Sequence, residues 1–385
     1  MKKVALVVGT RPEVIKMAPV FKELKKSETL APILLSTGQH KEMLQQAFDA
    51  FELTPDIDLK LMHPGQTLPD LTSRVLLSVT EFIKENSPDA ILVQGDTATV
   101  LATSIAAAFA QVPLGHVEAG LRTYNMMHPF PEEMNRRLTS PIARWSFVPT
   151  EQSRQNLLSE RIPAELIHVT GNSVIDSLLW MRDRVKQSTI SSADKAISIG
   201  ISSKFYQDRM VDGKRWILVT GHRRESFGGG FLSICEALLE LTKKYPDIGI
   251  LYPVHLNPNV REPVNRLLTN NPQIELIEPV GYENFVWLMD QCYFIVSDSG
   301  GVQEEAPSLG KPVLVMRETT ERPEGIDAGT CRLVGTDKVK ILAECDLLLK
   351  DKDSYVQRCQ LRNPYGDGTT SAQIRKILEA DLCQG

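Results

Sequence analysis

Val296-Ser-Asp-Ser-Gly-Gly-Val-Gln-Glu-Glu-Ala306 joins an apolar run to a helical pattern through a pair of glycines. The run at 293–296 predicts a buried strand, residues 297–301 predict a tight turn, and Val302 predicts the start of a helix. Such a turn directs the free N–H groups of the first helical turn at one spot, which suits a phosphate group. Taken alone, the stretch fits an ordinary glycine-rich turn equally well.

Polar side chains in the same stretch favour a nucleotide diphosphate as the ligand. Ser299 can add a hydroxyl donor to the amide cluster at Gly300 and Gly301. Glu305, one turn into the predicted helix, can accept hydrogen bonds from two vicinal ribose hydroxyls. We therefore predict a nucleotide-diphosphate site here.

Composition and charge argue against several classes of protein. The 385 residues, 42% of them hydrophobic, suffice for two domains with separate cores. A net charge of -5 argues against a nucleic-acid-binding surface, so any anion site must be local. The six cysteines form no Cys-X-X-Cys pair, which indicates reduced thiols in a cytoplasmic protein. No apolar run approaches the roughly 20 residues that cross a bilayer, and Val4–Val8 predicts a first strand rather than a signal peptide.

Short apolar runs alternate with amphipathic stretches, which predicts parallel sheets covered by helices on both faces. The first series of predicted strands comprises 4–8, 33–36, 90–94, 114–117 and 146–149, and the second comprises 216–220, 248–252, 274–277, 294–297 and 313–316. A Ser-, Lys- and Asp-rich surface excursion at 187–213 separates the two series. The pattern predicts an α/β protein of two doubly wound Rossmann-type domains, with ligands bound in a cleft at the carboxyl ends of the strands.

The expected domain boundaries follow from these two series of strands. Residues 1–172 should form an N-terminal Rossmann-like domain and residues 173–366 a C-terminal, nucleotide-binding one. A Pro- and Gly-containing break at 363–368 precedes a last predicted helix at 371–382. We expect residues 367–385 to pack back on the first domain.

Charged residues follow the predicted strands of the first domain. Arg11 and Lys16 lie beside the start of a helix that Pro12 opens, where they can neutralise a departing pyrophosphate or simply be solvated. Asp96 and Glu118 end two strands and should face the cleft, although an Asp in this position is often only a helix N-cap. Glu caps poorly, and the apolar neighbours of Glu118 should raise its pKa toward the range useful for proton transfer.

A polar loop at 121–131 leads into a further charged segment. Glu132 and Arg136, four residues apart, should share one face of a helix that begins near Pro131. The pair can be an ordinary surface ion pair or part of a mobile active-site wall.

Two histidines follow predicted strands of the second domain. His222, next to a glycine and two arginines, is expected to contact substrate, and His255 lies in a similar position with less support. No set of His, Cys and carboxylate residues has metal-ligand spacing, and no strand-to-helix turn contains Gly-X-Gly-X-X-Gly. We therefore expect neither a catalytic metal nor NAD or FAD.

Taken in order, the motifs resemble one protein family along essentially the whole chain. They are Gly9-Thr-Arg-Pro-Glu, Gly95-Asp-Thr, His116-Val-Glu-Ala-Gly-Leu-Arg-Thr, Pro131-Glu-Glu-Met-Asn-Arg, Gly221-His-Arg-Arg-Glu, Pro253-Val-His-Leu-Asn-Pro, Asp298-Ser-Gly-Gly-Val-Gln-Glu-Glu and Thr320-Glu-Arg-Pro-Glu. Each motif alone is weak, but the ordered set is specific. The chain resembles the bacterial non-hydrolysing UDP-N-acetylglucosamine 2-epimerases.

The resemblance implies a GT-B fold, a homodimer and a reversible conversion of UDP-GlcNAc to UDP-ManNAc for cell-surface polysaccharide, with no cofactor. In this family UDP is eliminated to give 2-acetamidoglucal and is then added back, with the C2 proton returned to the other face. The C2 hydrogen is weakly acidic, so loss of UDP must lead, with oxocarbenium character at C1. Groups that hold the diphosphate and carboxylates that face the cation would assist this step.

The resemblance also assigns residues, which are grouped here by expected role. The acid and base positions are Asp96, Glu118, Glu132 and His222. The nucleotide-sugar contacts are Arg11, Lys16, Arg136, Val280, Phe285 beside uracil, Ser299, Gly300, Gly301, Glu305 and Arg322. A second, activating UDP-GlcNAc would lie near Gln39, Glu42, Arg223 and His255.

Some positions depart from the family pattern. Val280 stands where enteric members have Gln, and Gln94 stands where many members have His. Glu42 and Gly65 occupy positions that are Gln and Arg in some Gram-positive members, which makes activation by substrate less secure than catalysis.

Other functions share parts of this pattern. A hydrolysing 2-epimerase would release ManNAc and UDP, and a GT-B glycosyltransferase would share the fold and the nucleotide site. A sensing module would bind the nucleotide sugar without turnover. The sequence also leaves the sugar open, because an oxidised or 3-acetamido analogue differs only in groups whose pocket a sequence does not display.

Overall fold

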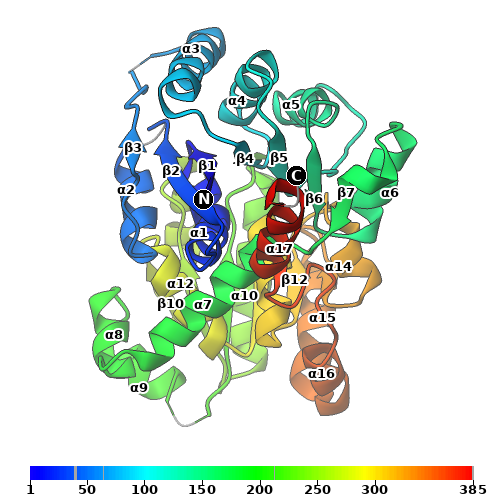
Figure 1. Cartoon of the computed structure of the whole chain (residues 1–385). Helices are drawn as coiled ribbons and strands as arrows, with labels where there is room; N and C mark the ends of the chain where they lie inside the picture. The colour runs from blue at the N-terminus through cyan, green and yellow to red at the C-terminus, as the bar shows by residue number, and fades with distance from the viewer. Residues whose placement is uncertain (39–40, 64, 212, 384–385) are drawn as a thin grey trace. The chain divides into compact units, whose positions relative to one another are not determined.

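The computed structural model describes residues 1–38, 41–63, 65–211 and 213–383, and for 41–43 only the backbone. The chain divides into two compact units (Figure 1). The first comprises Met1–Trp180 and Tyr365–Gly385, and the second comprises Met181–Pro364. The point where the chain leaves the first unit lies inside a continuous helix, because helix α7 runs from Ser173 to Gln187.

Within the described residues, the first unit is built on a seven-stranded parallel sheet of order β3-β2-β1-β4-β5-β6-β7. Its strands are β1 Lys2–Val8, β2 Leu30–Ser36, β3 Ile57–Asp58, β4 Ala90–Gln94, β5 Leu114–Val117, β6 Trp145–Val148 and β7 Ile167–Val169. The central strands β4 and β5 are buried along their whole length, as expected for a parallel sheet with both faces covered.

Helices connect these strands, and the last helix of the chain returns to them. The helices are α1 Arg11–Leu24, α2 Lys41–Ala50, α3 Leu68–Asn86, α4 Ala98–Phe109, α5 Glu132–Thr139, α6 Glu151–Ser159, η1 Ala164–Leu166, α7 Ser173–Gln187 and α17 Thr370–Cys383. Helix α17 packs against α1, and its Asp381 accepts hydrogen bonds from Arg144 and from the indole of Trp145. The C-terminal segment therefore belongs to the first unit.

The described part of the second unit contains a six-stranded parallel sheet of order β10-β9-β8-β11-β12-β13. Its strands are β8 Trp216–Thr220, β9 Gly249–Pro253, β10 Ile274–Ile277, β11 Phe294–Ser297, β12 Val313–Val315 and β13 Cys331–Leu333. Its helices are α8 Ser192–Ser198, α9 Ser203–Arg209, η2 Arg224–Ser226, α10 Gly229–Lys244, α11 Pro258–Leu268, α12 Tyr282–Gln291, α13 Gly300–Glu305, η3 Ala306–Leu309, α14 Pro323–Asp327, α15 Lys338–Lys350 and α16 Lys352–Cys359. Trp216, Tyr252 and Phe294 are fully buried in its core.

The two predicted series of strands are confirmed, with differences at the sheet edges and at one helix start. The sequence analysis missed β3, β7 and β13, since runs of two or three residues give too weak an apolar signal. The segment 187–213 includes α8 and α9, whose starts are capped by Ser191 and Ser202. The predicted start of helix α13 at Val302 is wrong: the extended Ser299 is the N-cap, so both glycines lie in the first turn.

No helix in the described ranges combines the length and the apolar character that crossing a membrane requires.

Candidate active site

In the first unit, the turns after β1, β4 and β5 lie at one edge of the sheet. Strand β1 pairs with β4, and β4 pairs with β5, all in parallel. The carboxyl ends of parallel strands meet at one edge, so the residues that follow these three strands come together. These residues include most of the acid and base positions expected in this unit.

Glu118 is the most enclosed of the expected catalytic carboxylates. It follows β5, is 5% exposed, and has a φ of 63°, a conformation that costs a non-glycine residue about 1–3 kcal/mol. Lys16 Nζ lies 2.7 Å and 2.6 Å from its two carboxylate oxygens. Lys16, expected to contact the nucleotide sugar, is therefore an ion-pair partner of Glu118 in this structure. The carboxylate is desolvated as expected, but its surroundings are polar rather than apolar.

Two amide side chains also donate to Glu118, and the sequence analysis did not assign either to the site. Gln94, at the end of β4, donates to Oε2, and Asn172 donates to Oε1 at 3.2 Å. The orientation of the Asn172 amide is set on both sides, since its oxygen accepts from the backbone N–H of Val174 at 3.1 Å. The backbone N–H of Asn172 donates to the backbone carbonyl of Tyr365, the residue at which the chain returns to the first unit. The departure at Gln94 therefore places a neutral amide, rather than an imidazole, against Glu118.

Asp96 forms an ion pair rather than a helix cap. Thr97 caps α4, whereas Asp96 Oδ2 lies 2.8 Å from Arg136 Nη1. The backbone carbonyl of Asp96 accepts a hydrogen bond from Asn135 at 2.7 Å. Burial and the nearby charges of Glu118 and Glu132 raise the pKa of Asp96, and Arg136 offsets this only in part.

The Pro-Glu-Glu motif gives its two glutamates different surroundings. Glu133 pairs with Arg136 at 2.6 Å and accepts from the backbone N–H groups of Thr123 and Tyr124, so it fixes the preceding loop. The expected pair of Glu132 with Arg136 is wrong, because Arg136 turns to the residue three positions back and to Asp96. Glu132 Oε2 is buried and has no hydrogen-bond partner among the described residues. Glu132 therefore remains available for a ligand.

Glu13 is a buried carboxylate that the sequence analysis missed. It accepts from the backbone N–H groups of Gly9 (2.5 Å) and Thr10 (2.8 Å) and from the hydroxyl of Thr97 (2.6 Å). Burial raises the pKa of Glu13 to about 6, against the effect of these hydrogen bonds. Glu13 thus ties the turn where Arg11 begins α1 to the turn that carries Asp96. The capping pattern Thr-X-X-Glu was the signal that could have revealed this role.

In the second unit, the turns after β8 and β11 are joined by a carboxylate. Strands β8 and β11 are neighbours, and Asp298 follows β11. Asp298 Oδ2 accepts from the backbone N–H groups of His222 (2.7 Å) and Arg223 (2.8 Å), and Oδ1 lies 3.1 Å from His222 Nδ1. Burial tends to raise the pKa of Asp298, but the donors from His222 and Arg223 outweigh it and lower the pKa.

His222 also contacts the second histidine singled out from the sequence. The rings of His222 and His255 are stacked, with centroids 5.6 Å apart and an angle of 25° between planes. The His222 side chain is 40% exposed, so part of the ring faces solvent. The expected catalytic His222 and the expected regulatory His255 are therefore in direct contact.

The glycine turn after β11 packs against the guanidinium group of Arg322. A Cβ added to Gly300 would lie 2.8 Å from Arg322 Cζ, so any larger residue here would displace the guanidinium group. Arg322 Nε in turn donates to Glu304 at 2.6 Å. Ser299 and Gly301 complete the turn, and the short helix α13 begins at Gly300.

Glu305 and the aromatic residues of α12 form the next part of this region. Tyr282 donates to Glu305 at 2.6 Å, a partner that the sequence analysis missed. Phe285 lies three residues after Tyr282 in the same helix and is half-buried, which places both rings toward one face. Val280 precedes this helix and is half-buried as well.

The expected activating site is described only in part. Gln39 lies outside the described residues, and the side chain of Glu42 in α2 is not described either. Arg223 and His255 belong to the second unit, and the Arg223 Nε has no hydrogen-bond partner among the described residues. A second nucleotide-sugar site therefore stays a prediction.

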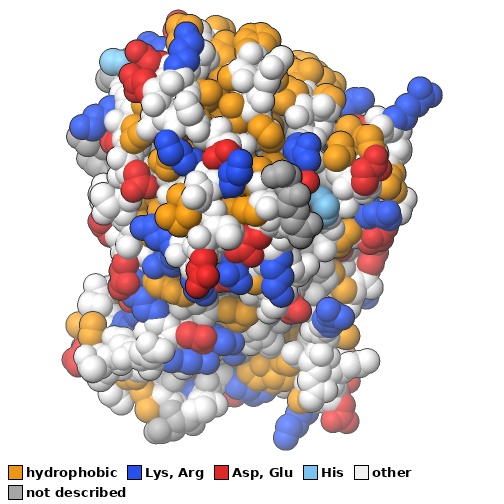
Figure 2. All heavy atoms as spheres, viewed as in Figure 1, with side chains coloured by type: hydrophobic (Ala, Val, Ile, Leu, Met, Phe, Trp, Pro, Cys, Tyr) orange, Lys and Arg blue, Asp and Glu red, His pale blue; other side chains and the backbone are white. Residues whose placement is uncertain are grey.

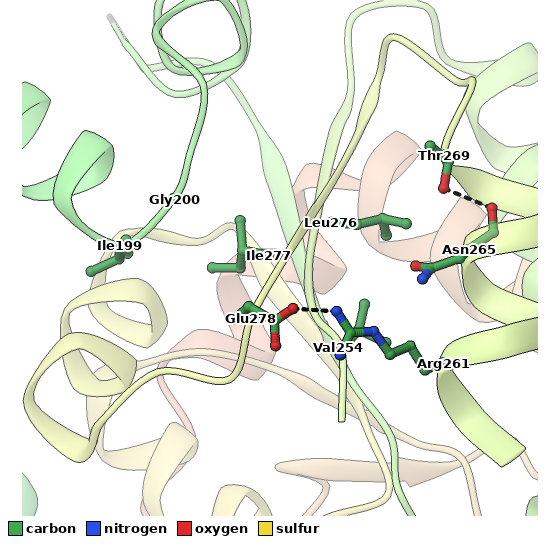
Figure 3. A pocket seen from close by; sticks show the side chains of 9 residues that line it. All are labelled: Ile199, Gly200, Val254, Arg261, Asn265, Thr269, Leu276, Ile277 and Glu278. Carbon is green, nitrogen blue, oxygen red and sulfur yellow. Dashed lines mark hydrogen bonds and ion pairs between the residues drawn. The ribbon is translucent and has the colours of Figure 1, made fainter. Parts of the chain in front are cut away.

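A separate hollow of about 590 Å³ lies at one edge of the second unit's sheet, beside α11 (Figure 3). Apolar side chains including Val254 and Ile277 line it, and the Arg261–Glu278 ion pair spans part of its wall. None of its lining residues belongs to the expected site.

Comparison with known proteins gives a consistent result over the whole chain. Residues 22–379 match the family described as UDP-N-acetylglucosamine 2-epimerase. The chain is 52% identical over 377 residues to the UDP-N-acetylglucosamine 2-epimerase of Escherichia coli (strain K12), covering 98% of both chains. It is 51% identical to a probable UDP-N-acetylglucosamine 2-epimerase of Ralstonia solanacearum, covering 99% of both.

Solved structures extend the likeness to three dimensions. UDP-GlcNAc 2-epimerase from Neisseria meningitidis, bound to UDP-GlcNAc, is 46% identical with a TM-score of 0.88, over 98% of this chain and 100% of that chain. The enzyme from Methanocaldococcus jannaschii in complex with UDP-GlcNAc and UDP is 31% identical with a TM-score of 0.78, over 98% and 99%. The expected GT-B-like fold of two parallel-sheet domains is confirmed.

Proposed function

Because the chain belongs to the UDP-N-acetylglucosamine 2-epimerase family, we propose that it converts UDP-GlcNAc into UDP-ManNAc and back without releasing free sugar. The observation that carries the proposal is the pair of carboxylates at the ends of β4 and β5, the half-buried Asp96 and the buried Glu118, held by Arg136 and Lys16. Such groups serve proton transfer and stabilisation of a cation, which a module that only binds would not need.

The second unit holds the nucleotide in this proposal. The N–H groups at the start of α13 and the Arg322 guanidinium bind the diphosphate, which carries the negative charge that both prefer. Glu305, oriented by Tyr282, accepts from the ribose hydroxyls, and Phe285 packs against uracil. This arrangement stabilises the departing UDP more than the bound substrate, since charge grows on the phosphate as the bond breaks.

Elimination breaks the C1–O bond, and its electron pair leaves with UDP. The positive charge that develops at C1 and its ring oxygen is stabilised by carboxylates of the first unit. A base then removes the C2 proton, and the C2–H electrons form the C1–C2 double bond of 2-acetamidoglucal. Return of a proton to the other face of C2 and of UDP to C1 completes the epimerisation. No oxidant or reductant is consumed.

The surroundings of the carboxylates suggest different roles for them. Glu118 accepts from the Lys16 ammonium and from two amides, and these donors suit an ionised carboxylate facing a cation. Burial raises the pKa of Asp96, which favours a group that carries a proton. Glu132, whose buried Oε2 has no hydrogen-bond partner among the described residues, and His222 are the further candidates for the group that acts on the second face of C2.

The remaining expectations from the resemblance join this proposal. We expect a homodimer, for which the exposed apolar residues Leu77 on α3 and Phe109 on α4 offer a contact surface. Figure 2 shows hydrophobic side chains gathered over the region of these two helices. The product would supply ManNAc units for surface polysaccharide, and Arg223 with His255 would take part in activation by a second substrate molecule.

The test is incubation with UDP-GlcNAc in D2O, followed by proton and phosphorus NMR. The proposal expects UDP-ManNAc with deuterium at C2, and exchange of 18O between bridging and non-bridging positions of the anomeric phosphate. Free ManNAc with UDP would identify a hydrolysing enzyme, and turnover only with an added acceptor would identify a glycosyltransferase. Binding without turnover would leave a sensing module.

A further inference from the structure

Asp298 is a buried carboxylate in the turn after β11, and the proposed function gives it no role. It is 1% exposed, so its charge is withdrawn from water and must be met by donors of the protein. Oδ2 has two such donors, the backbone N–H groups of His222 and Arg223, at 2.7 Å and 2.8 Å. These bonds hold the turn after β8, but they occupy only one of the two oxygens.

The other oxygen, Oδ1, faces the imidazole of His222. It is buried, lies 3.1 Å from His222 Nδ1, and has no hydrogen-bond partner of regular geometry among the described residues. A carboxylate oxygen can only accept, so satisfying Oδ1 requires a hydrogen on Nδ1. The neutral ring then carries its lone pair on Nε2, and the charged ring carries a hydrogen there.

We propose that Asp298 is a positioning residue that holds His222 with Nδ1 protonated and presents Nε2 to the reacting groups. The inference rests on the proposed function, in which His222 touches the nucleotide sugar. In this tautomer Nε2 can accept a proton in one direction of the reaction and return it in the other. The Asp298 charge stabilises the imidazolium formed in between, and the stacked His255 ring limits rotation of His222.

A purely structural role for Asp298 predicts a different result for the Asp298→Asn variant, namely a kcat equal to that of the wild type. If Asp298 only held the turn, asparagine would replace it, because its carbonyl oxygen can still accept from the two backbone N–H groups. The amide of Asp298→Asn would then point its NH2 group at Nδ1. Because an NH2 group only donates, Nδ1 would have to accept, and the hydrogen would move to Nε2. The substitution therefore preserves the turn and reverses the tautomer.

The experiment is 15N NMR of protein labelled in the histidine rings, above the pH at which the rings are charged, with the His222 signals identified by their loss in His222→Gln. The wild type should show the hydrogen on Nδ1, and Asp298→Asn should show it on Nε2. In the product assay, kcat of Asp298→Asn should fall about 10²- to 10⁴-fold. The dissociation constant for UDP should change less than about 3-fold, since Asp298 makes no proposed contact with the nucleotide.

A matched control is Asp346→Asn, which removes a carboxylate bonded to Lys244 and Tyr245 elsewhere in the second unit. It should leave the His222 tautomer and kcat unchanged. The same tautomer in Asp298→Asn and wild type, or a wild-type kcat in Asp298→Asn, would overturn the positioning role. If Asp298→Asn does not fold, the wild-type spectrum still tests the proposal, because a hydrogen on Nε2 of His222 would by itself overturn the positioning role. Tautomer reversal in a protein without epimerase activity would support the positioning of His222 and refute the proposed function.

Discussion

Two sets of expected site residues, one in each unit, neutralise charge in different ways. In the first unit, acidic and basic side chains pair with one another: Lys16 with Glu118, and Arg136 with both Asp96 and Glu133. In the second unit, the glycine turn after β11 offers backbone N–H groups, and Arg322, which is paired with Glu304, lies against Gly300. The carboxylates of such pairs can take up and release a proton, whereas backbone amides cannot.

This difference predicts different effects for substitutions in the two sets of residues. Ionised pairs buried in a sheet edge respond strongly to a change in one partner, because each charge depends on the other for its solvation. A turn of backbone N–H groups responds instead to a change of shape. Substitutions in the ion pairs of the first unit should therefore affect chemistry before binding, and substitutions in the glycine turn after β11 should affect binding before chemistry.

Among the substitutions that test this comparison between the units, the largest effect is expected for Glu118→Gln. The amide keeps the volume and one acceptor for Lys16, but it removes the negative charge and the basic oxygen. We expect kcat for epimerisation to fall about 10³-fold, within the range for loss of an acid or base group. The affinity for UDP, measured by calorimetry, should stay within about 3-fold because Glu118 itself is not among the proposed UDP contacts.

The control for this change is Glu151→Gln, a carboxylate of α6 in the same unit whose side chain is 61% exposed. It should retain the wild-type kcat and UDP affinity. A wild-type rate in Glu118→Gln would remove Glu118 from the mechanism. A parallel loss of UDP affinity would break the division of work between the units.

The second effect is expected for Gly300→Ala, which should weaken UDP binding up to about 100-fold, the equivalent of about 3 kcal/mol for a charge-assisted contact. The added Cβ would lie 2.8 Å from Arg322 Cζ, so the guanidinium must move away from Glu304 and from the phosphate site. Gly229→Ala is a matched control: Gly229 is also the first residue of a helix, and its Cβ would meet nothing within 4 Å. Equal affinities for UDP in the two variants would contradict the packing of Arg322 on Gly300.

The smallest effect concerns stability and tests how burial changes the pKa of a carboxylate in the first unit. Glu13 has a pKa of about 6 in the folded protein against about 4.5 in the unfolded chain, so folding favours its protonated form. Its contribution is fully present below about pH 4.5 and is lost as the pH rises through about 6, an effect of about 2 kcal/mol. Glu13→Gln cannot ionise and lacks this dependence.

Urea unfolding of both proteins between pH 4 and 7 provides the measurement. The unfolding free energy of the wild type, taken relative to Glu13→Gln, should decrease by about 2 kcal/mol across this range. Other titrating groups, including the buried His116 whose pKa burial lowers to about 4, are common to both proteins and cancel in the difference. A difference that does not vary with pH would show that Glu13 is ionised at no cost.

The sequence by itself determined the two parallel sheets and the ends of strands at which the site lies. Strands buried on both faces must be continuous apolar runs, and glycine and charged residues must follow them where a ligand approaches. Asp96, Glu118, His222 and the glycine turn were predicted as site residues in this way. The arguments against NAD or FAD, from the lack of a Gly-X-Gly-X-X-Gly turn, and against a nucleic-acid-binding surface, from the net charge of -5, also came from the sequence alone.

Only the tertiary structure decided which of these groups meet. Lys16 and Glu118 are 102 positions apart, and His222 and Asp298 are 76 apart, so their contacts depend on which strands lie side by side. Even within one helix, periodicity allowed Arg136 to meet either of two glutamates, and packing against Asp96 selected Glu133. A residue's chemistry is local, but the partner that sets its charge and orientation is chosen by the order of strands in the sheet.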